Sequence, residues 1–487
     1  MKDSVDFSGR PFHFIGIGGI GMSALAYVLA KRQLPVSGSD LRPNHITSKL
    51  ESIGAHIFAK QEASNLEFFR PKENENRVIL NTQNHVSTDK VAQLPQVICS
   101  TAINTNNLEY KAALELGCPI FHRSDVLATL ISEYDSIAVA GTHGKTTTSS
   151  MIGYMLLQAG LDPTILIGGE VDAWEGNARL GQSRYLVAEA DESDGSLVKH
   201  TPEIGVITNI ELDHPDHYDN LEEVVEIFRT FANSCKTLVA SIDCATVRDR
   251  LQPTISYSLY PDTGANYTVT NIDYRADGTT ALVWERGKAL GVLNLRLLSR
   301  HNLSNALAAV AVGRVLGLEF GEIAKGLATF EGARRRFEFR GEAHGITFID
   351  DYAHHPSEIR ATLAAARLQA RPGQRVVAIF QPHRYSRTLA FLEEFAESFT
   401  HADVVILTDI YSAGEVNIGQ VSGEQLAQEV AKHHPQVKYQ ANLALMCDFL
   451  QQTLRSGDLA LFLGAGNLNQ VIPEVIATLH QPATATS

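Results

Sequence analysis

The residues best suited to chemistry lie in the string Gly141-Thr142-His143-Gly144-Lys145-Thr146, which follows the apolar run SIAVA and opens the stretch TTTSSMIGYMLLQAG. Glycines let backbone N–H groups face a phosphate, and the N-terminus of a helix adds positive potential. Lys145 is expected to reach the terminal phosphates of a nucleotide, and the Thr146 hydroxyl suits Mg²⁺. The general GxxxxGK[ST] pattern requires glycine where this chain has Val139, so the loop is a variant. Its place between a predicted strand and a predicted helix favours nucleotide binding over a structural turn.

Two acidic clusters end predicted strands in the same part of the chain. One is EADESD at residues 189–194, and the other is TNIELDH at residues 208–214. Each alone is more typical of a solvated turn or a helix cap, but their joint placement lets them converge on a bound triphosphate. Mg²⁺ prefers oxygen ligands and can accept a nitrogen. The two clusters together therefore predict a Mg²⁺ site.

A second glycine-rich turn, GIGGIG at residues 16–21, follows FHFI and precedes a helical stretch, and Asp40 closes the next predicted strand. By pattern alone this is a dinucleotide fingerprint, which predicts an NAD enzyme. The physical requirement is only a diphosphate on a helix N-terminus, and a UDP-sugar meets it equally well. The turn therefore predicts a diphosphate ligand and leaves its identity open.

Polar clusters also end two predicted strands near the C-terminus, DDYAHHP at residues 350–356 and QPHRYSR at residues 381–387. Arg384 and Arg387 are three residues apart, so on a helix they share a face and can clamp a carboxylate or a phosphate. His355 precedes a proline, and packing or capping is an alternative role for it. The string HNLSN at residues 301–305 opens a helical stretch, where it can serve as an N-cap or can recognise a nucleotide base.

Short apolar runs alternate with stretches of helical period along the whole chain, which indicates parallel α/β structure. Ligands bind beyond the carboxyl ends of parallel strands, where these polar clusters stand. We expect three units, with boundaries accurate to about ten residues. They are a first α/β unit at residues 1–115, a second with the phosphate loop at 116–332, and a third at 333–487 after the charged junction EGARRRFEFRG.

Composition excludes several classes of protein. A chain of 487 residues is too long for a single core, and 44% apolar residues predict that most of it folds. The net charge of −14 argues against a general nucleic-acid or membrane-surface binder. Five scattered cysteines without metal-site spacing favour a reducing compartment. The absence of long apolar runs predicts a soluble, cytoplasmic protein, with a disordered polar tail after about His480.

The motifs together resemble the Mur ligase family, and the resemblance covers almost the whole chain. The matching strings, in the order of the family, are GIGGIGMSALA, STAI, HRSDVL, GTHGKTTT, EADESD, TNIELDH, HNLSNALAA, RRF, DDYAHHPSEIRATLAA, QPHRYSRT and LTDIYSAGE. The resemblance implies a Rossmann-like UDP-binding domain, a central P-loop ATPase α/β domain, and a C-terminal Rossmann-like domain that closes over the site. It also implies an ATP-dependent ligase of peptidoglycan precursor synthesis that joins L-alanine to UDP-N-acetylmuramate through an acyl phosphate.

The resemblance also implies roles for individual residues. Lys145 would hold the β and γ phosphates, Thr146 and Glu189 would bind one Mg²⁺, and Glu189 and His214 a second. The expected ATP-binding residues are Gly141, Thr142, His143, Gly144, Lys145, Thr146, Thr147, Asn302 and Asn305 at the adenosine, Arg336 at the phosphates and Asp351 at the ribose. The expected residues at the UDP-sugar are Gly18, Gly19, Ile20, Gly21, Asp40 and Ser100, and those at the incoming amino acid are His354, Arg384 and Arg387.

Many relatives carry a carbamylated lysine near the second metal, where this chain has Arg229, so we expect no carbamate here. Two related alternatives are a ligase that joins a murein tripeptide to the same sugar, and folylpolyglutamate synthase, for which the glycine-rich first unit is unexpected. An NAD-dependent oxidoreductase would leave GTHGKT unexplained. A regulatory nucleotide-binding module would not need the His and Arg cluster of the third unit. We expect no nucleic acid, membrane or specific protein partner.

Overall fold

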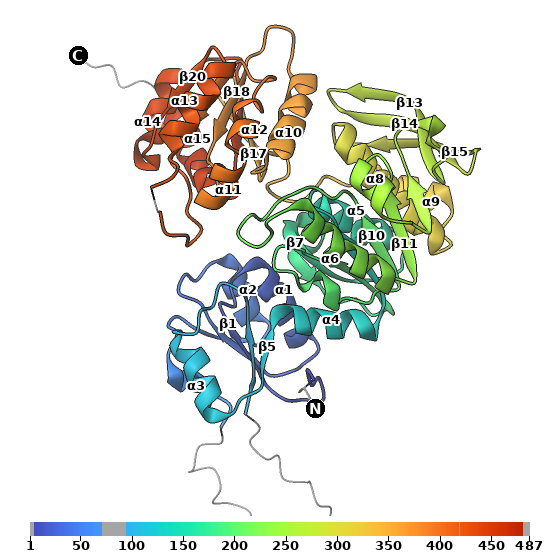
Figure 1. Ribbon diagram of the computed structural model, residues 1–487, viewed down its shortest axis with the longest axis vertical. Coiled ribbons are helices and arrows are strands. Elements are labelled where there is room, and N and C mark those ends of the chain that lie inside the picture. Colours follow the sequence, from blue (N-terminus) through green and yellow to red (C-terminus); the bar gives the residue numbers. More distant parts are fainter. Residues whose placement is uncertain (1–3, 71–93, 418, 481–487) are drawn as a thin grey trace, which may run out of the picture.

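The computed structural model describes residues 4–70, 94–417 and 419–480, and the tail after His480 that we predict to be disordered lies outside them. The chain forms three bodies, each built on its own sheet with helices against it; the first lies at the bottom of Figure 1, the second in the middle and upper right, and the third at the upper left. We call them the first, second and third domains. No helix in the described ranges is both long and apolar enough to cross a lipid bilayer.

The first domain is a five-stranded parallel sheet of order β3-β2-β1-β4-β5. The last strand, β5, lies beyond the boundary expected at residue 115, so the first domain extends further than the sequence pattern indicated. A long helix, α4, then leads into the second domain. The elements are β1 Phe12–Ile15, α1 Ile20–Lys31, β2 Val36–Ser39, α2 His45–Ser52, β3 His56–Phe58, β4 Gln96–Cys99, α3 Leu108–Leu116, β5 Ile120–His122 and α4 Arg123–Glu133.

The second domain carries a ten-stranded sheet of order β15-β14-β13-β12-β11-β10-β6-β9-β7-β8, parallel in its centre and antiparallel at both ends. Helix α5 follows β6 directly. The elements are β6 Asp135–Ala140, α5 Lys145–Gln158, β7 Thr164–Val171, β8 Gly176–Arg179, β9 Tyr185–Glu189, β10 Ile204–Ile207, α6 Leu221–Ser234, β11 Thr237–Ser241, α7 Ala245–Arg250, β12 Ile255–Tyr257, β13 Tyr267–Arg275, β14 Gly278–Glu285, β15 Lys288–Leu295, α8 Arg300–Val315 and α9 Phe320–Leu327.

The third domain has a six-stranded sheet of order β16-β17-β21-β18-β19-β20, in which only β16 is antiparallel. The elements are β16 Glu338–Ala343, β17 Ile346–Asp351, α10 Pro356–Gln369, β18 Val376–Phe380, α11 Tyr385–Ala390, α12 Leu392–Ala396, β19 Val404–Leu407, α13 Gly423–His433, β20 Val437–Tyr439, α14 Met446–Thr453, β21 Leu459–Leu463 and α15 Val471–His480.

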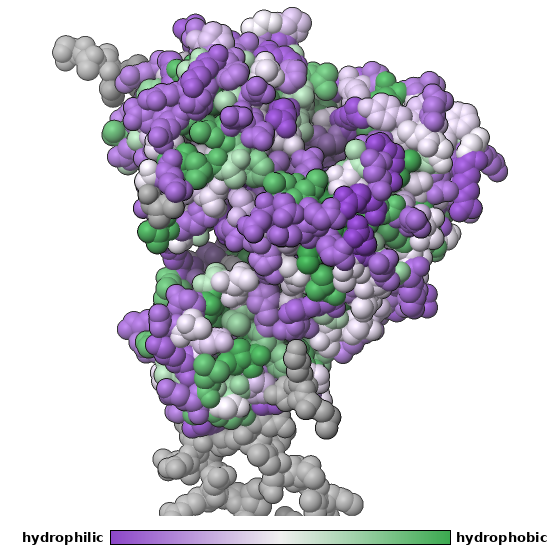
Figure 2. All heavy atoms as spheres, viewed as in Figure 1, coloured by the Kyte–Doolittle hydropathy of each residue, from purple (hydrophilic) through white to green (hydrophobic). Residues whose placement is uncertain are grey.

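The central strands of the second and third sheets are largely apolar because helices cover both faces of a parallel sheet. Strands β6, β10 and β18 are almost entirely buried. Their backbone groups pair with neighbouring strands, and the polar motifs stand where the strands end. Figure 2 shows the surface hollowed between the first and third domains, on the side where these strand ends meet.

Candidate active site

The phosphate loop joins β6 to α5 and needs glycine at two positions. Gly141 and Gly144 have φ values of +138° and +81°, in the region that favours glycine. A Cβ atom on Gly141 would lie 2.0 Å from Thr208 Oγ1, and one on Gly144 would lie 2.7 Å from Asn305 Oδ1. Between them, the His143 amide donates to Asn209 Oδ1 at 2.8 Å. The loop is therefore held close to the segments that follow β10 and begin α8.

Lys145 is engaged by its own loop and by a buried acid. Its Nζ donates to the carbonyl oxygens of Gly141 and Thr142 at 2.7 and 3.2 Å and to Glu192 Oε2 at 2.8 Å. Burial opposes the charge, but Glu192 and Asp191 raise the pKa of Lys145 above its ordinary value. The ammonium is thus charged and stands where the terminal phosphates of a nucleotide are expected.

The acidic residues that pair with Lys145 are Asp191 and Glu192. Asp191, Glu192 and His214 have ligand atoms that all lie within 4.8 Å of one another. Glu189 accepts a hydrogen bond from the Gly168 amide at 2.8 Å and lies outside this group, although it faces the same cavity as His214. Two carboxylates and one imidazole are donors that Mg²⁺ accepts. Of the EADESD string, Asp191 and Glu192 belong to this group, and Glu189 and Asp191 line the second cavity described below.

A cavity of about 1070 Å³ opens on one side of the phosphate loop, between the second and third domains. It brings together the residues predicted for adenosine and ribose, and Tyr154, Phe330 and His301 add apolar and aromatic surface. The predicted residues that line it are His143, Gly144, Thr147, Asn302, Asn305, Arg336 and Asp351. Burial raises the pKa of Asp351 to about 6. The volume of this cavity and its mixed polar and apolar lining suit a nucleotide.

A second cavity, of about 770 Å³, lies on the other side of the loop and is lined by all three domains. Gly144, Arg336 and Glu358 line both cavities, so the two meet at the phosphate loop. The other predicted residues that line the second cavity are Gly19, Ile20, Gly21 and Ser100 from the first domain, Thr142, Lys145, Thr146, Glu189 and His214 from the second, and His354, Arg384 and Arg387 from the third.

Gly18 and Asp40 were predicted at the UDP-sugar but line neither cavity. The Gly18 amide donates to Asp40 Oδ2 at 2.9 Å, and a Cβ atom on Gly18 would lie 2.7 Å from the same oxygen. Both residues therefore stabilise the turn before α1. Arg123, which the sequence did not single out, does line the second cavity, and its Nη2 lies 3.2 Å from Asp194 Oδ2.

Arg384 and Arg387 face the cavity from α11 and its N-terminus but already have acidic partners in the second domain. Arg387 Nε donates to Asp213 Oδ1 at 2.9 Å, and both side chains are buried. Burial opposes the charge, yet Arg387 holds the pKa of Asp213 well below its usual range. Arg384 pairs with Asp216. The two arginines therefore bind the third domain to the second as well as lining the predicted amino-acid site.

Family models match three consecutive parts of the chain. They are the "Mur ligase family, catalytic domain" at residues 11–135, the "Mur ligase middle domain" at residues 139–313, and the "Mur ligase, glutamate ligase domain" at residues 335–466. Curated relatives named UDP-N-acetylmuramate--L-alanine ligase are 83% identical in Nostoc punctiforme and 79% in Trichormus variabilis, in each case over 100% of both chains.

The chain belongs to the Mur ligase family. The fold agrees with this assignment, since a solved Mur ligase, the UDP-N-acetylmuramate-alanine ligase MurC of Thermotoga maritima, matches with a TM-score of 0.79 and 26% identity. The match covers 96% of this chain and 98% of that one. A murein peptide ligase of Psychrobacter arcticus shares the fold, with a TM-score of 0.70 and 21% identity, over 98% of this chain and 100% of that chain.

Two more features of this Mur ligase bear on the site. Burial lowers the pKa of His354 to about 4, so this imidazole is neutral at pH 7 beside the second cavity. Arg229, where other members of the family carry a carbamylated lysine, lies on α6 in an ion pair with Glu226 and lines neither cavity.

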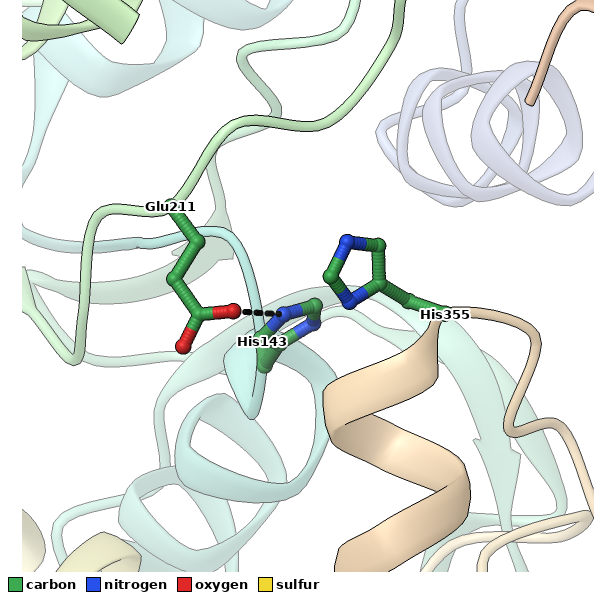
Figure 3. Close-up of side chains that lie close together, drawn as sticks. All are labelled: His143, Glu211 and His355. Atoms are coloured by element: carbon green, nitrogen blue, oxygen red, sulfur yellow. Dashed lines mark hydrogen bonds and ion pairs between the residues drawn. The ribbon is translucent and has the colours of Figure 1, made fainter. Parts of the chain in front are cut away.

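His143 reaches from the phosphate loop to the third domain. Its Nε2 lies 3.2 Å from Glu211 Oε2, and its Nδ1 lies 3.2 Å from Glu358 Oε1 at the start of α10. Figure 3 shows Glu211 and His355 on either side of this imidazole. Glu211 and Glu358 carried no role in the sequence analysis, because their partner lies far away in the chain.

Proposed function

We propose that this chain is an ATP-dependent ligase that joins L-alanine to the carboxylate of UDP-N-acetylmuramate and releases ADP and phosphate. The observation that carries the proposal is the meeting of two cavities at one phosphate loop, where Gly144 lines both cavities and Lys145 lines the second. A nucleotide in the first cavity and a sugar carboxylate in the second would place the reacting groups together. The names of relatives 83% and 79% identical over their full length supply the substrates.

A carboxylate and an amine do not condense in water, so the acid first needs a better leaving group than hydroxide. In the proposed first step, a carboxylate oxygen of the sugar attacks the γ-phosphorus of ATP, the bond to the β,γ-bridging oxygen breaks, and ADP leaves. The ammonium of Lys145 would neutralise charge on the transferred group, which is the main requirement in phosphoryl transfer. For this to happen Lys145 exchanges Glu192, its partner in the structure, for a phosphate oxygen.

Mg²⁺ is the second cofactor that we propose, and the residues present fit it. Asp191, Glu192 and His214 would hold the ion beside Thr146, and Glu189 would serve from the second cavity, which Asp191 and His214 also line. When bound, Mg²⁺ would screen the charge of the polyphosphate. We propose Glu192 in place of Glu189 as the principal carboxylate ligand, since its oxygens lie close to both Lys145 and His214.

In the second step the neutral amine of alanine attacks the acyl carbon, and the tetrahedral intermediate expels phosphate. Arg384 and Arg387 are proposed to hold the alanine carboxylate, which orients the amine without blocking it. His354 is neutral at pH 7, so it would not repel the ammonium group of alanine, which must lose a proton in this site before it attacks. Closure of the third domain would keep water from the acyl phosphate.

The division of labour follows the domains. We propose that the first domain, which includes strands β1 to β5, binds the UDP diphosphate at Gly19, Ile20 and Gly21. The second domain binds ATP, and the third supplies the amino-acid site. The reaction is assigned to the cytoplasm, an assignment that five cysteines free of disulfides support.

The test is phosphate release with ATP, UDP-N-acetylmuramate and a single amine donor. We expect release with alanine and little with the murein tripeptide L-alanyl-γ-D-glutamyl-meso-diaminopimelate. Preference for the tripeptide would assign the chain to murein-peptide recycling. Absence of release, together with a change in nicotinamide absorbance when NAD replaces ATP, would overturn the proposal.

A further inference from the structure

His143 belongs to the phosphate loop, yet its side chain bonds to the third domain. Its backbone is fixed in the second domain, where its amide donates to Asn209 Oδ1 at 2.8 Å and its carbonyl accepts from Thr208 Oγ1 at 2.6 Å. Its imidazole lies between Glu211, on the loop after β10, and Glu358, in the first turn of α10. A displacement of α10 therefore pulls directly on the loop expected to hold the phosphates.

Both ring nitrogens of His143 face a carboxylate at 3.2 Å, and both can donate only in the protonated imidazole. Burial opposes that charge, but Glu211 and Glu358 raise the pKa of His143 to about 10. His355 is the third titratable group that faces it, at 4.7 Å between ring centroids. His143, Glu211 and His355 stand close enough for a metal ion, but the proton on His143 would have to leave first. The geometry therefore favours an ion pair over a metal site.

Glu358 extends the connection to the amino-acid site. One of its oxygens bonds His143, and the other accepts from the His354 amide at 2.9 Å and lies 3.2 Å from His354 Nδ1. His354 lines the second cavity, where the amine is expected. A second bridge runs in parallel, because Ser357 Oγ donates to Glu211 Oε2 at 2.7 Å. One short chain of contacts, His143 to Glu358 to His354, thus joins the phosphate loop to the amine side.

We propose that His143 is a positioning residue that couples the phosphate loop to the third domain, so that the site is closed and His354 is in place while the acyl phosphate exists. This inference rests on the proposed function for its chemistry, though not for its geometry. Because the contact between His143 and Glu358 is charge-assisted and lies at the phosphate loop, it couples closure of the third domain to phosphate binding. When the contact is lost, the third domain opens more often and water reaches the acyl phosphate.

Hydrolysis of the acyl phosphate regenerates the sugar carboxylate and releases phosphate, so ATP is consumed without amide product. Phosphate release in excess of amide formation is therefore the specific sign that the contact is lost. An ordinary loss of stability would lower both products together and leave their ratio unchanged. The variants His143→Gln and Glu358→Gln remove charge from opposite ends of the contact, and His401→Gln, at an exposed position in the third domain, is the matched control.

The first measurement is the ratio of phosphate released to amide formed, with the KM for alanine and for the UDP-sugar. We expect a ratio near one for the wild type and His401→Gln, and a ratio of at least two for His143→Gln and Glu358→Gln. The KM for alanine should rise severalfold while that for the UDP-sugar changes little. His143→Arg keeps a cation with several donors and should return the ratio toward one. A ratio of one in both glutamine variants would overturn the proposal.

The second measurement is small-angle X-ray scattering of the full chain with ADP, which needs no turnover. We expect a larger radius of gyration for His143→Gln and Glu358→Gln than for the wild type and His401→Gln. Identical scattering of all four proteins would overturn the coupling role, whatever the enzymatic result. A wild type without ligase activity would instead overturn the proposed function, and the scattering would still test the contact between the domains.

Discussion

At the scale of single residues, the cations of the site are paired with acidic side chains, which the substrates must replace as partners. Lys145 is neutralised by Glu192, and Arg387 by Asp213, and all four side chains are largely or fully buried. A buried charge left without its partner is strongly destabilising, whereas a ligand that replaces the partner keeps the balance. Binding of ATP is therefore expected to shift Glu192 from Lys145 toward a metal ion, with little change in the buried charge.

Replacement of Lys145 should separate catalysis from sugar binding. We expect Lys145→Ala to lower kcat by about a hundredfold or more, because a charge that stabilises the transferred phosphate is lost. The Kd for UDP-N-acetylmuramate, measured by calorimetry, should change by less than about threefold, since that ligand is assigned chiefly to the first domain. Activity within a few fold of the wild type would contradict the role of the loop.

The two candidate metal carboxylates can be compared directly. We expect Glu192→Gln to raise the Mg²⁺ concentration for half-maximal phosphate release by about tenfold, and Glu189→Gln to raise it less, because Glu192 lies with Asp191 and His214. Binding of Mn²⁺, followed by its electron paramagnetic resonance signal, gives the same comparison without turnover. A larger effect of Glu189→Gln in both assays would restore Glu189 as the principal ligand.

At the scale of elements, the conformation of the turn from β6 to α5 depends on a glycine backbone. Helix α5 is capped by Gly144 with φ of +81°, and the loop before it contacts the start of α8 through Asn305. A side chain at residue 144 would strain the backbone and would also clash with Asn305. The turn therefore links nucleotide binding to the packing of two helices.

The pair Gly144→Ala and Gly160→Ala separates these two effects. Both glycines have positive φ, so each substitution should lower the free energy of unfolding by roughly 1–2 kcal/mol. A Cβ atom on Gly144 would lie 2.7 Å from Asn305 Oδ1, whereas one on Gly160 would meet nothing within 4 Å. We expect only Gly144→Ala to weaken ADP binding, by tenfold or more in calorimetry. Equal ADP affinities would show that the loop tolerates the side chain.

At the scale of the whole molecule, ion pairs at His143, Arg384 and Arg387 connect the second and third domains. Such contacts are more sensitive to pH than an apolar interface of the same size. The domain arrangement is therefore expected to depend on the protonation of His143, whose pKa is raised to about 10.

The sign of this dependence follows from the raised pKa. His143 has a pKa of about 10 in the folded protein and an ordinary value of 6.5. Its contribution is fully present below pH 6.5 and is lost as the pH rises through 10, with an upper limit of roughly 5 kcal/mol. We expect the difference in free energy of unfolding between wild type and His143→Gln, from urea titrations, to shrink between pH 7 and pH 10. A difference that grows with pH would contradict the protonated state.

The sequence by itself determined the phosphate loop, the order of the motifs, the three-part α/β organisation and the family. These features are local, because a glycine-rich turn between a strand and a helix carries its function in consecutive residues. The predicted adenosine and amino-acid residues line the two cavities for the same reason, since each belongs to a short motif at the end of a strand or the start of a helix.

Only the tertiary structure decided which charges meet. Strands β10, β6 and β9 are neighbours in the sheet although they are far apart in the chain, so the residues that follow them converge on Lys145. That arrangement pairs Lys145 with Glu192, and the docking of the third domain pairs Arg387 with Asp213 and His143 with Glu358. Strand order and domain docking depend on packing between distant segments, whereas the spacing of residues in the sequence reports only on neighbours along the chain.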